Sequence, residues 1–274
     1  MFKVNENKIP MVSVTIPTYN EENSLPFALE AVKNQNYPKL EVIVIDSNSK
    51  DNTKKIASQF GAKVINYDGK LLGARYIGVK ESKGDYILLL DADQVLKKDS
   101  IQRAVNKIVG YDMLIFEEDS YKPLTFIQKK LSEERRIAHN EINSLDPLVS
   151  GLLPRFFKKN LLMSAFEKIP KNLYEIVVSG DHAIIYFEAY KISKKIDILN
   201  DAVSHIEPES LKELLTHFYR FGKSSKNLAK TGYYNELFKN KTNIKKNTIK
   251  ALKNENLIIA FLQTLFYRIG YNFG

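Results

Sequence analysis

The N-terminal half of the chain alternates short apolar runs with helical segments, and this alternation constrains the fold more than any other feature. The run MVSVTI, which begins at Met11, predicts a buried strand, and the apolar residues of positions 23–33 share one helical face. Three more strands are predicted: LEVIVID (40–46), AKVINY (62–67) and DYILLLDAD (85–93). Helices are predicted between them, at about 53–60 and 72–82. Such alternation predicts right-handed βαβ units and a mainly parallel sheet with helices on both faces.

Three of the predicted strands end in polar residues. PTYNEE (17–22) follows the first strand, DSNSKDN (46–52) the second, and DAD (91–93) the fourth. Ligands of such sheets bind at the carboxyl ends of the strands. We therefore expect the three segments to border one site.

Asp91 and Asp93 end the most apolar of these strands. Two carboxylates so close together repel one another unless a cation lies between them, and their hard oxygen atoms suit Mg²⁺ or Mn²⁺ bridging to a substrate diphosphate. The alternative is a solvated turn, since Asp-x-Asp is a common sequence. The position after YILLL, in line with two other polar strand ends, favours the metal site.

The first two polar segments offer groups suited to a nucleotide. Pro17 fixes the chain as it leaves the sheet, Tyr19 offers a flat face for a base, and Glu21 offers a hydrogen-bond acceptor. Asp46 is suited to accept a hydrogen bond from a nucleobase N–H, with Ser47 beside it. For both segments the alternative is that their polar residues cap the following helix.

Together, VTIPTYNEE, VIDSNSKDNT and GARYIGVKESKGDYILLLDAD resemble the successive signatures of family 2 of the GT-A glycosyltransferases, in order and in spacing, over residues 14–93. The resemblance implies an α/β, Rossmann-like GT-A fold, with a mainly parallel sheet flanked by helices and a C-terminal helical extension. It also implies an inverting enzyme that uses a nucleotide sugar and a divalent metal, Mn²⁺ or Mg²⁺. Two departures, Ser47-Asn48-Ser49 for Asp-Gly-Ser and Tyr76 for Asn, bear on the choice of base.

The resemblance assigns roles within these motifs. It implies that Arg75, with Lys70 near it, approaches the diphosphate, and that Asp91 and Asp93 serve the ribose and the metal, with Asp93 the direct ligand. The residues expected to bind the nucleotide sugar are Pro17, Thr18, Tyr19, Glu21, Asp46, Ser47, Lys70, Arg75, Asp91 and Ala92.

Two later segments also resemble family motifs. Arg155, in PRFFKKN, resembles the Arg that precedes the acceptor-side helix, and Gly180-Asp181-His182 resembles the family's Glu-Asp motif with Gly for Glu. The resemblance implies that Asp181 is the general base for the acceptor hydroxyl, a role that burial supports if it raises the carboxyl pKa. The alternative is that Asp181 is the N-cap of the next helix.

His205 lies just beyond a short predicted strand at 196–199. Related enzymes often supply a late His to the metal, so His205 is the candidate third ligand beside Asp91 and Asp93. The alternative is an ordinary surface histidine.

Arg220 and Lys223 lie three residues apart on a helix predicted from residue 210 to about 228. This spacing places both cations on one face of the helix. They suit the phosphates of donor or acceptor, and the alternative is a solvated helical face.

The C-terminal segment combines positive charge with apolar residues. The chain has 41 Lys and Arg against 32 Asp and Glu, a net charge of +9, and residues 239–253 carry several Lys and no acid. An apolar, aromatic helix follows (LIIAFLQTLFYRIGYNFG). This order favours peripheral contact of 239–274 with an anionic membrane, over a helix that packs on the domain with its Lys solvated.

The N-terminus and the length of the apolar stretches bear on where in the cell the protein is located. The N-terminus lacks the apolar core of a signal peptide, and no apolar stretch is long enough to span a bilayer. We therefore expect a cytoplasmic protein at the inner face of the membrane. The absence of Cys excludes disulfides and thiolate metal sites.

The expected organisation is a nucleotide-sugar-binding half (1–110), an acceptor-binding and catalytic half of the same domain (111–230) and the tail (231–274). The predicted reaction transfers a sugar from a nucleoside diphosphate, UDP before GDP, to an acceptor hydroxyl in glycan or glycolipid assembly. The basic, aromatic tail favours a polyprenyl- or lipid-linked acceptor; a soluble sugar or a protein is the alternative. The sequence shows no covalent nucleophile that we identify, in line with inversion by a single displacement.

Two other classes of protein remain as alternatives. A nucleotidyltransferase would show a Gly- and basic-rich triphosphate loop after the first strand, where this chain has the acidic PTYNEE. A non-catalytic protein that binds membranes or nucleic acid would suit the net charge, but acidic strand ends repel phosphate unless a metal is present. We therefore expect no nucleic-acid partner.

Overall fold

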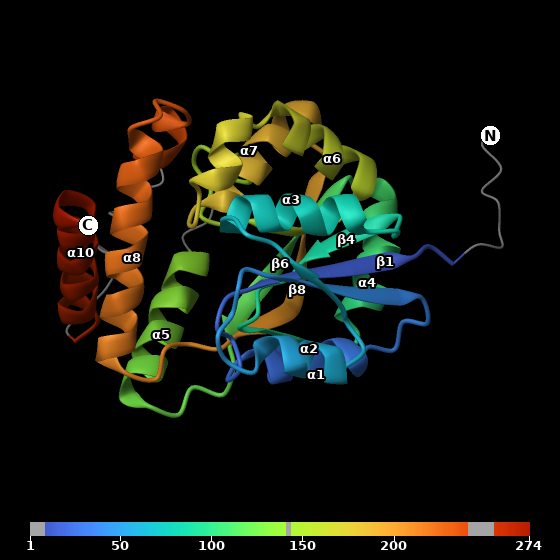
Figure 1. The fold of residues 1–274 in the computed structure, drawn as a ribbon, viewed down its shortest axis with the longest axis horizontal. Helices are drawn as coiled ribbons and strands as arrows, with labels where there is room; N and C mark the ends of the chain where they lie inside the picture. The colour runs from blue at the N-terminus through green and yellow to red at the C-terminus, as the bar shows by residue number, and fades with distance from the viewer. Residues whose placement is uncertain (1–8, 141–143, 241–254) are drawn as a thin grey trace.

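The computed structural model describes residues 9–140, 144–240 and 255–274, and its described strands form one eight-stranded sheet with helices on both faces (Figure 1). The strand order is β3-β2-β1-β4-β7-β6-β8-β5. The strands are β1 (Val12–Thr18), β2 (Leu40–Asp46), β3 (Lys63–Asn66), β4 (Tyr86–Leu89), β5 (Gln94–Leu96), β6 (Met113–Ser120), β7 (Pro154–Lys158) and β8 (Ile196–His205). The helices are α1 (Leu25–Lys33), α2 (Thr53–Gln59), α3 (Leu71–Glu81), α4 (Ser100–Lys107), α5 (Phe126–Asn140), α6 (Lys159–Lys168), α7 (Asp181–Ile192), α8 (Leu211–Ala229) and α10 (Glu255–Phe273).

The N-terminal strands form the parallel part of the sheet. β1 pairs in parallel with β2 and β4, and β2 pairs in parallel with β3. Helices α1, α2 and α4 cover one face and α3, α6 and α7 the other (Figure 1). This arrangement confirms the predicted α/β architecture.

The second half completes the same sheet with mixed strand directions. β7 lies antiparallel to both β4 and β6, β6 pairs in parallel with β8, and β5 pairs antiparallel with β8. The sequence patterns did not predict β5, β6 or β7, and they ended β8 too early. His205 is therefore the last residue of a ten-residue strand rather than a residue beyond a short one.

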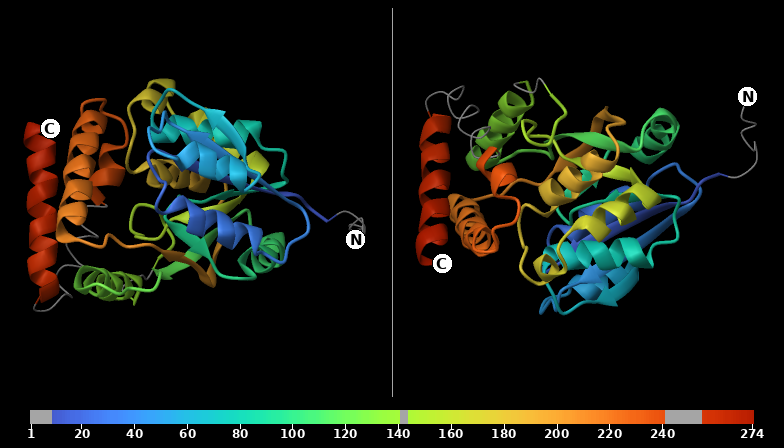
Figure 2. Two further views of the ribbon diagram at one scale, coloured as in Figure 1. Left: turned by 60° about the horizontal axis from the view of Figure 1, so that its bottom comes forward. Right: turned by 90° about the horizontal axis from the view of Figure 1, so that it is seen from above.

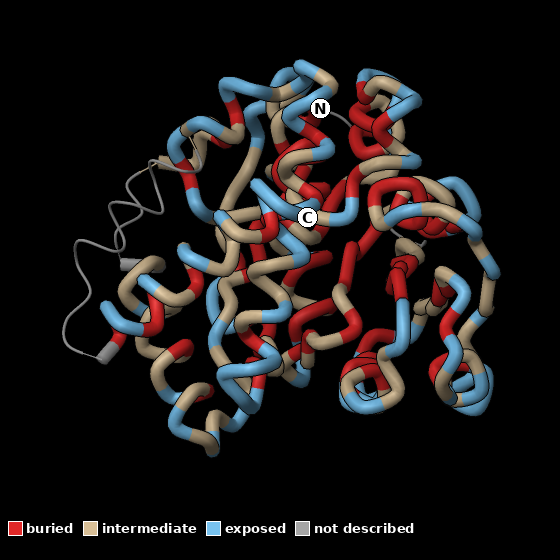
Figure 3. Tube along the Cα trace, turned by 60° about the vertical axis from the view of Figure 1, so that its left-hand side comes forward, coloured by how far each residue is buried: buried red, intermediate tan, exposed pale blue. Residues whose placement is uncertain are grey.

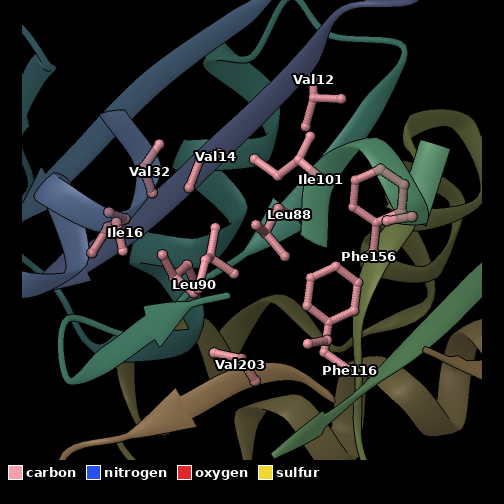
Figure 4. Close-up of a cluster of buried hydrophobic side chains, with 14 of the residues drawn as sticks. Val12, Val14, Ile16, Val32, Leu88, Leu90, Ile101, Phe116, Phe156 and Val203 are labelled. Atoms are coloured by element: carbon pink, nitrogen blue, oxygen red, sulfur yellow. The ribbon is translucent and has the colours of Figure 1, made fainter. Parts of the chain in front are cut away.

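Strand β1 lies at the centre of the core, and all seven of its residues are buried. Because side chains alternate along a strand, Val12, Val14 and Ile16 point to the same face. There they pack with apolar residues of α1, α4, β6 and β7, as Figure 4 shows. The opposite face of the sheet packs against α3, α6 and α7 around a second cluster that includes Ile87 and Phe157.

The C-terminal helix α10 lies along α8 on one side of the molecule, next to α5 (Figures 1 and 2). Two glycines let the helices approach closely. A Cβ at Gly222 would lie 2.0 Å from the carbonyl oxygen of Tyr267, and one at Gly270 would lie 2.0 Å from that of Tyr219. The helical end of the predicted tail thus packs on the domain. Most of the Lys-rich run, residues 241–254, lies outside the described residues.

The described helices also bear on whether the chain crosses a membrane. None of them combines the length and the apolar character that a membrane crossing requires.

Phe156 allows a test of the core. Its ring is fully buried and lies 5.5 Å from the ring of Tyr86 and 5.9 Å from that of Phe116, centroid to centroid. We expect Phe156→Ala to lower the free energy of unfolding by about 3–5 kcal/mol, because it leaves a cavity between packed strands. Urea denaturation measures this change. A loss below about 1 kcal/mol would mean that the core at β7 relaxes around the cavity.

Candidate active site

The polar segments after β1 and β2 are locked together by hydrogen bonds. The backbone N–H of Asn20 donates to Ser49 Oγ at 2.9 Å, and the N–H of Lys50 donates to Asn20 Oδ1 at 2.8 Å. The N–H of Glu21 donates to Thr53 Oγ1 at 2.8 Å. Asn20 and Asn48 both have positive φ, a conformation that Asn tolerates well. The two loops, residues 19–24 and 47–52, therefore form one rigid unit at the end of the parallel strands, which we call the double loop.

Asp46 lies beneath this double loop and is completely buried. Its Oδ1 accepts a hydrogen bond from Thr18 Oγ1 at 3.2 Å, and its Oδ2 accepts one from the N–H of Ser49 at 3.0 Å. The carboxylate thus holds the two loops to their strands. A contact of Asp46 with a nucleobase stays a prediction.

Asp91, Ala92 and Asp93 form the tight connection from β4 to β5. The side chain of Gln94 stabilises it by accepting a hydrogen bond from the N–H of Asp91 at 2.9 Å. In the β5–β8 ladder, Gln94 lies opposite His205, and the N–H of Ile206 donates to the carbonyl of Asp93 at 2.8 Å. This pairing brings His205 Nε2 to 3.2 Å from Asp93 Oδ2. Two residues more than a hundred positions apart therefore meet at one edge of the sheet.

The Asp93–His205 pair has features of a cation site. Within the described part of the chain, Asp93 Oδ1 is buried and has no hydrogen-bond partner. His205 Nδ1 lies 3.4 Å from Glu207 Oε2, so the imidazole stands between two carboxylates. Burial lowers the pKa of His205, but Asp93 and Glu207 outweigh this effect and raise it to about 10. A metal ion at Nε2 would replace the proton that these carboxylates otherwise hold there.

Glu21 joins the first loop to this cluster of acids. Burial, together with the charges of Asp93, Asp51 and Asp91, raises the pKa of Glu21 to about 7, against the effect of a hydrogen bond from Ser24. The first and third polar segments therefore lie near one another, as expected from their places at the strand ends. Such a concentration of carboxylates is stabilised by a cation.

Asp91 is held differently from Asp93. Its Oδ1 forms an ion pair with Arg75, and its Oδ2 accepts from Arg155 Nη1 at 2.6 Å. Burial alone would raise the pKa of Asp91, but Arg155 and Arg75 hold it well below its usual range. Among the described residues, no group of three or more His, Asp or Glu side chains is arranged to hold a metal. The role of Asp91 as a metal ligand stays a prediction.

Arg75 is the buried centre of the site, with 1% of its surface exposed. Its guanidinium pairs with Asp91 through Nη2 and with Asp181 through Nε. Sequence reasoning placed Arg75 at the diphosphate of a ligand. In the structure it joins the β4–β5 connection to the start of α7, and its contact with a diphosphate stays a prediction.

Asp181 is not a helix cap. The N-cap of α7 is Gly180, which has a φ of 78°, and Asp181 is the first residue of the helix. Burial acts to raise the pKa of Asp181, but its ion pair with Arg75 outweighs this and lowers it. The condition stated for that role, a pKa raised by burial, is therefore not met, because a buried cation faces the carboxylate. The role of Asp181 as a base stays a prediction.

Arg155 lies on β7 and points into the same network. Besides Asp91, its Nη1 contacts His182 Nε2, and its Nη2 lies 3.8 Å from Glu118 Oε1. Burial and the positive charges of Arg155 and Arg75 lower the pKa of His182 to about 4, so the imidazole is neutral at pH 7.

Sequence reasoning missed three charged residues that continue this network. Arg135 of α5 pairs with Glu118 of β6, and its Nη2 lies 2.8 Å from Glu207 Oε1. Glu207 in turn contacts His205 and accepts from Ser120 at 2.7 Å. The one available signal was the spacing of His205 and Glu207, two positions apart at the end of a strand. Residues so spaced extend on one side of the chain.

The remaining predicted residues differ in exposure. Pro17 and Thr18 are buried at the end of β1 and Ala92 is buried in the β4–β5 connection, whereas Tyr19 and Lys70 are exposed and Ser47 is half-buried. Arg220 and Lys223 are exposed on α8. That helix faces the site, because the pKa of its His217, which burial lowers, also responds to the charges of Asp93 and His205. Ligand contacts of these residues stay predictions.

The family model "Glycosyl transferase family 2" matches residues 13–159, which include the double loop and the Asp91–Asp93 turn. The chain belongs to glycosyltransferase family 2. It is 37% identical to Glycosyltransferase AglE of Haloferax volcanii over 111 residues, which cover 37% of this chain and 36% of AglE. It is 26% identical to the GalNAc(5)-diNAcBac-PP-undecaprenol beta-1,3-glucosyltransferase of Campylobacter jejuni over 196 residues, 67% of this chain and 60% of that enzyme. The matches thus span between about a third and three fifths of these relatives.

Solved structures show the same fold. TarS 1-349 of S. aureus in complex with UDP-GlcNAc aligns with a TM-score of 0.59 and 17% identity over 95% of this chain and 89% of that chain. The mannosyltransferase PcManGT of Pyrobaculum calidifontis in complex with GDP-Man and Mn²⁺ aligns with a TM-score of 0.59 and 16% identity. The alignment covers 97% of this chain and 76% of that chain. These likenesses confirm the GT-A fold expected from the family 2 motifs.

Arg75→Met tests the buried ion pairs. The variant leaves Asp181 buried without its cation, and we expect a loss of about 3–5 kcal/mol in the free energy of unfolding. Urea denaturation measures it, with Lys63→Met as the control. Lys63 forms a solvent-exposed pair with Glu81 at 2.8 Å, and its loss should change stability little. Equal stability of the two variants would show that Arg75 does not hold the site together.

Proposed function

We propose that this member of glycosyltransferase family 2 is a metal-dependent, inverting enzyme. It moves a sugar from a nucleoside diphosphate, with UDP preferred to GDP, to an acceptor hydroxyl. The donor would lie at the carboxyl ends of β1, β2 and β4, where the double loop meets the acidic turn. TarS and PcManGT, which share the fold, bind UDP-GlcNAc and GDP-Man respectively.

The Asp93–His205 pair carries the proposal. A buried carboxylate oxygen without a partner is costly, and a divalent cation is the ligand that satisfies it. Carboxylate and imidazole together suit Mn²⁺ or Mg²⁺. The described residues supply few protein ligands, which fits a metal that takes its remaining oxygens from a diphosphate and water. PcManGT, of the same fold, was solved with Mn²⁺.

Asp93 and His205 would hold the metal, with Asp91 beside them. A metal bound there neutralises negative charge on the leaving diphosphate. Glu207 fixes the His205 ring from its Nδ1 side. Arg75 and Arg155 neutralise Asp91 and keep the β4–β5 turn in place. The double loop carries Tyr19 and Ser47, which would contact the nucleobase.

Asp181 is the proposed general base for the acceptor hydroxyl. Its lowered pKa keeps it ionised at neutral pH, which is the state that accepts a proton. Arg75 contacts Asp181 at Oδ2 and fixes the carboxylate at the start of α7. Arg155, Arg220 and Lys223 are the proposed contacts for phosphate groups of donor or acceptor.

The proposed acceptor is polyprenyl- or lipid-linked, and the enzyme works in glycan or glycolipid assembly at the inner face of the membrane. The Campylobacter jejuni relative acts on an undecaprenol-linked glycan, as its name states. Residues 1–110 would bind the donor and 111–230 the acceptor, while 231–274 would form the membrane-proximal tail.

The donor site is tested by calorimetric titration of UDP and of GDP, each with and without Mn²⁺, into the wild type and Asp93→Asn. We expect metal-dependent binding that weakens about tenfold or more in the variant, since one charge-bearing ligand is lost. Asp119→Asn is the matched control, because Asp119 is exposed and pairs with Lys97 at 2.8 Å. Tight binding without metal, or equal binding by all three proteins, would contradict the metal site.

A further inference from the structure

The face of α10 that points away from α8 is apolar and exposed. Ile258 and Phe261 are 63% and 66% exposed, and Leu257 and Leu265 are 42% and 39% exposed. Their spacing of three, four and seven residues places them on one side of a helix. Figure 3, in which this side of the molecule comes forward, shows exposed segments recurring along the C-terminal helices.

The opposite face of α10 packs against α8 and α5. Ile259 and Ala260 are buried against α8 and α5, as is Gln263, whose Nε2 donates to Glu134 Oε2 at 3.2 Å. Gly270 lies in contact with the backbone of α8. The helix is therefore fixed in rotation, and its apolar outer side cannot turn toward the core.

The charges next to this face are positive, whereas the acids Glu133 and Glu134 of α5 contact the packed side of α10 through Asn256 and Gln263. From residue 256 to the C-terminus α10 contains Arg268 and no acid, and Arg268 is exposed on the same side as Phe261. On α8, Lys226 donates to the carbonyls of Asn272 and Gly274 at 3.1 and 3.4 Å, so it lies at the C-terminal end of α10. Lys212, at the start of α8, lines a groove that also contains Phe266 of α10.

A groove between the two helices adds apolar surface next to a cation. It encloses about 460 Å³ and is lined by Leu211, Lys212, Leu215, Thr216, Tyr219 and Phe266. A hydrocarbon chain fits such a lining, and Lys212 at the groove is suited to the phosphate of a headgroup.

We propose that the outer face of α10, with its basic margin on α8, binds the surface of an anionic lipid bilayer. The proposal rests on the membrane-proximal tail of the proposed function and names the surface that makes the contact, but it does not depend on the metal or the donor. Exposed apolar side chains bordered by cations are complementary to acyl chains below negative headgroups. The same face of a second copy would bring like charges together, which opposes self-association.

The orientation follows from α8. This helix carries the basic margin, and its His217 also lies near Asp93 and His205. A bilayer at α10 would therefore lie on the same side of the molecule as the strand-end site.

The experiment is co-sedimentation of the full chain with vesicles of phosphatidylcholine, alone or mixed equally with phosphatidylglycerol. We expect binding to the anionic vesicles, weakened by added salt, and little binding to the neutral ones. Ile258→Ser/Phe261→Ser should lower the partition coefficient by about tenfold or more, because two exposed apolar anchors are lost. The matched control is Phe60→Ser/Val109→Ser, since Phe60 and Val109 are 38% and 77% exposed far from α10.

Sedimentation velocity without lipid and nucleotide titration complete the test. The α10 variant should remain folded and bind nucleotide like the wild type, so a failure of the donor site would be seen separately. Equal vesicle binding by the α10 variant and its control, or no binding by the wild type, would overturn the proposal. A dimer that only the α10 variant loses would also overturn it, because a second copy would then cover this face.

Discussion

The site depends on one buried cation, the guanidinium of Arg75. It joins Asp91, which follows the central strand β4, to Asp181, which begins α7 on one face of the sheet. Without a positive charge at this point, the buried carboxylate of Asp181 and the half-buried one of Asp91 would face one another, and the turn and the helix could not stay close. Arg155 and Arg135 repeat the arrangement toward β6 and β8, so Asp91, Asp181, Glu118 and Glu207 each have an arginine beside them. Asp93, with one oxygen left without a partner among the described residues, is where an added cation fits best.

Much of the N-terminal half could be predicted from the sequence because its signals are local. Strands β1 to β4 are continuous apolar runs separated by amphipathic helices, and the polar residues at their ends follow from the rule for parallel sheets. The clustering of Glu21, Asp91 and Asp93 was foreseeable for the same reason. The family resemblance added the prediction that His205 lies beside Asp91 and Asp93, which local patterns could not indicate.

The rest of the sheet could not be predicted because its pairing is not local. β5 has three residues and β7 five, and each is defined by its partner strand rather than by its own pattern. The roles of Arg75 and Glu207 depend on their ion pairs with Asp181 and Arg135, which lie 106 and 72 positions away in the sequence. Burial by itself raises the pKa of Asp181, but only the structure shows the cation that reverses the effect.

The double loop has a consequence for how such a chain changes over generations. Its hydrogen bonds run through backbone groups and through Asn20, Ser49 and Thr53, and none of them uses the side chain of Tyr19. Substitution at Tyr19 would therefore leave the hydrogen bonds of the double loop intact and change only the exposed surface of the loop. Given the proposed contact of Tyr19 with the base, selection could change which base is preferred one residue at a time, without the intermediate sequences losing their fold.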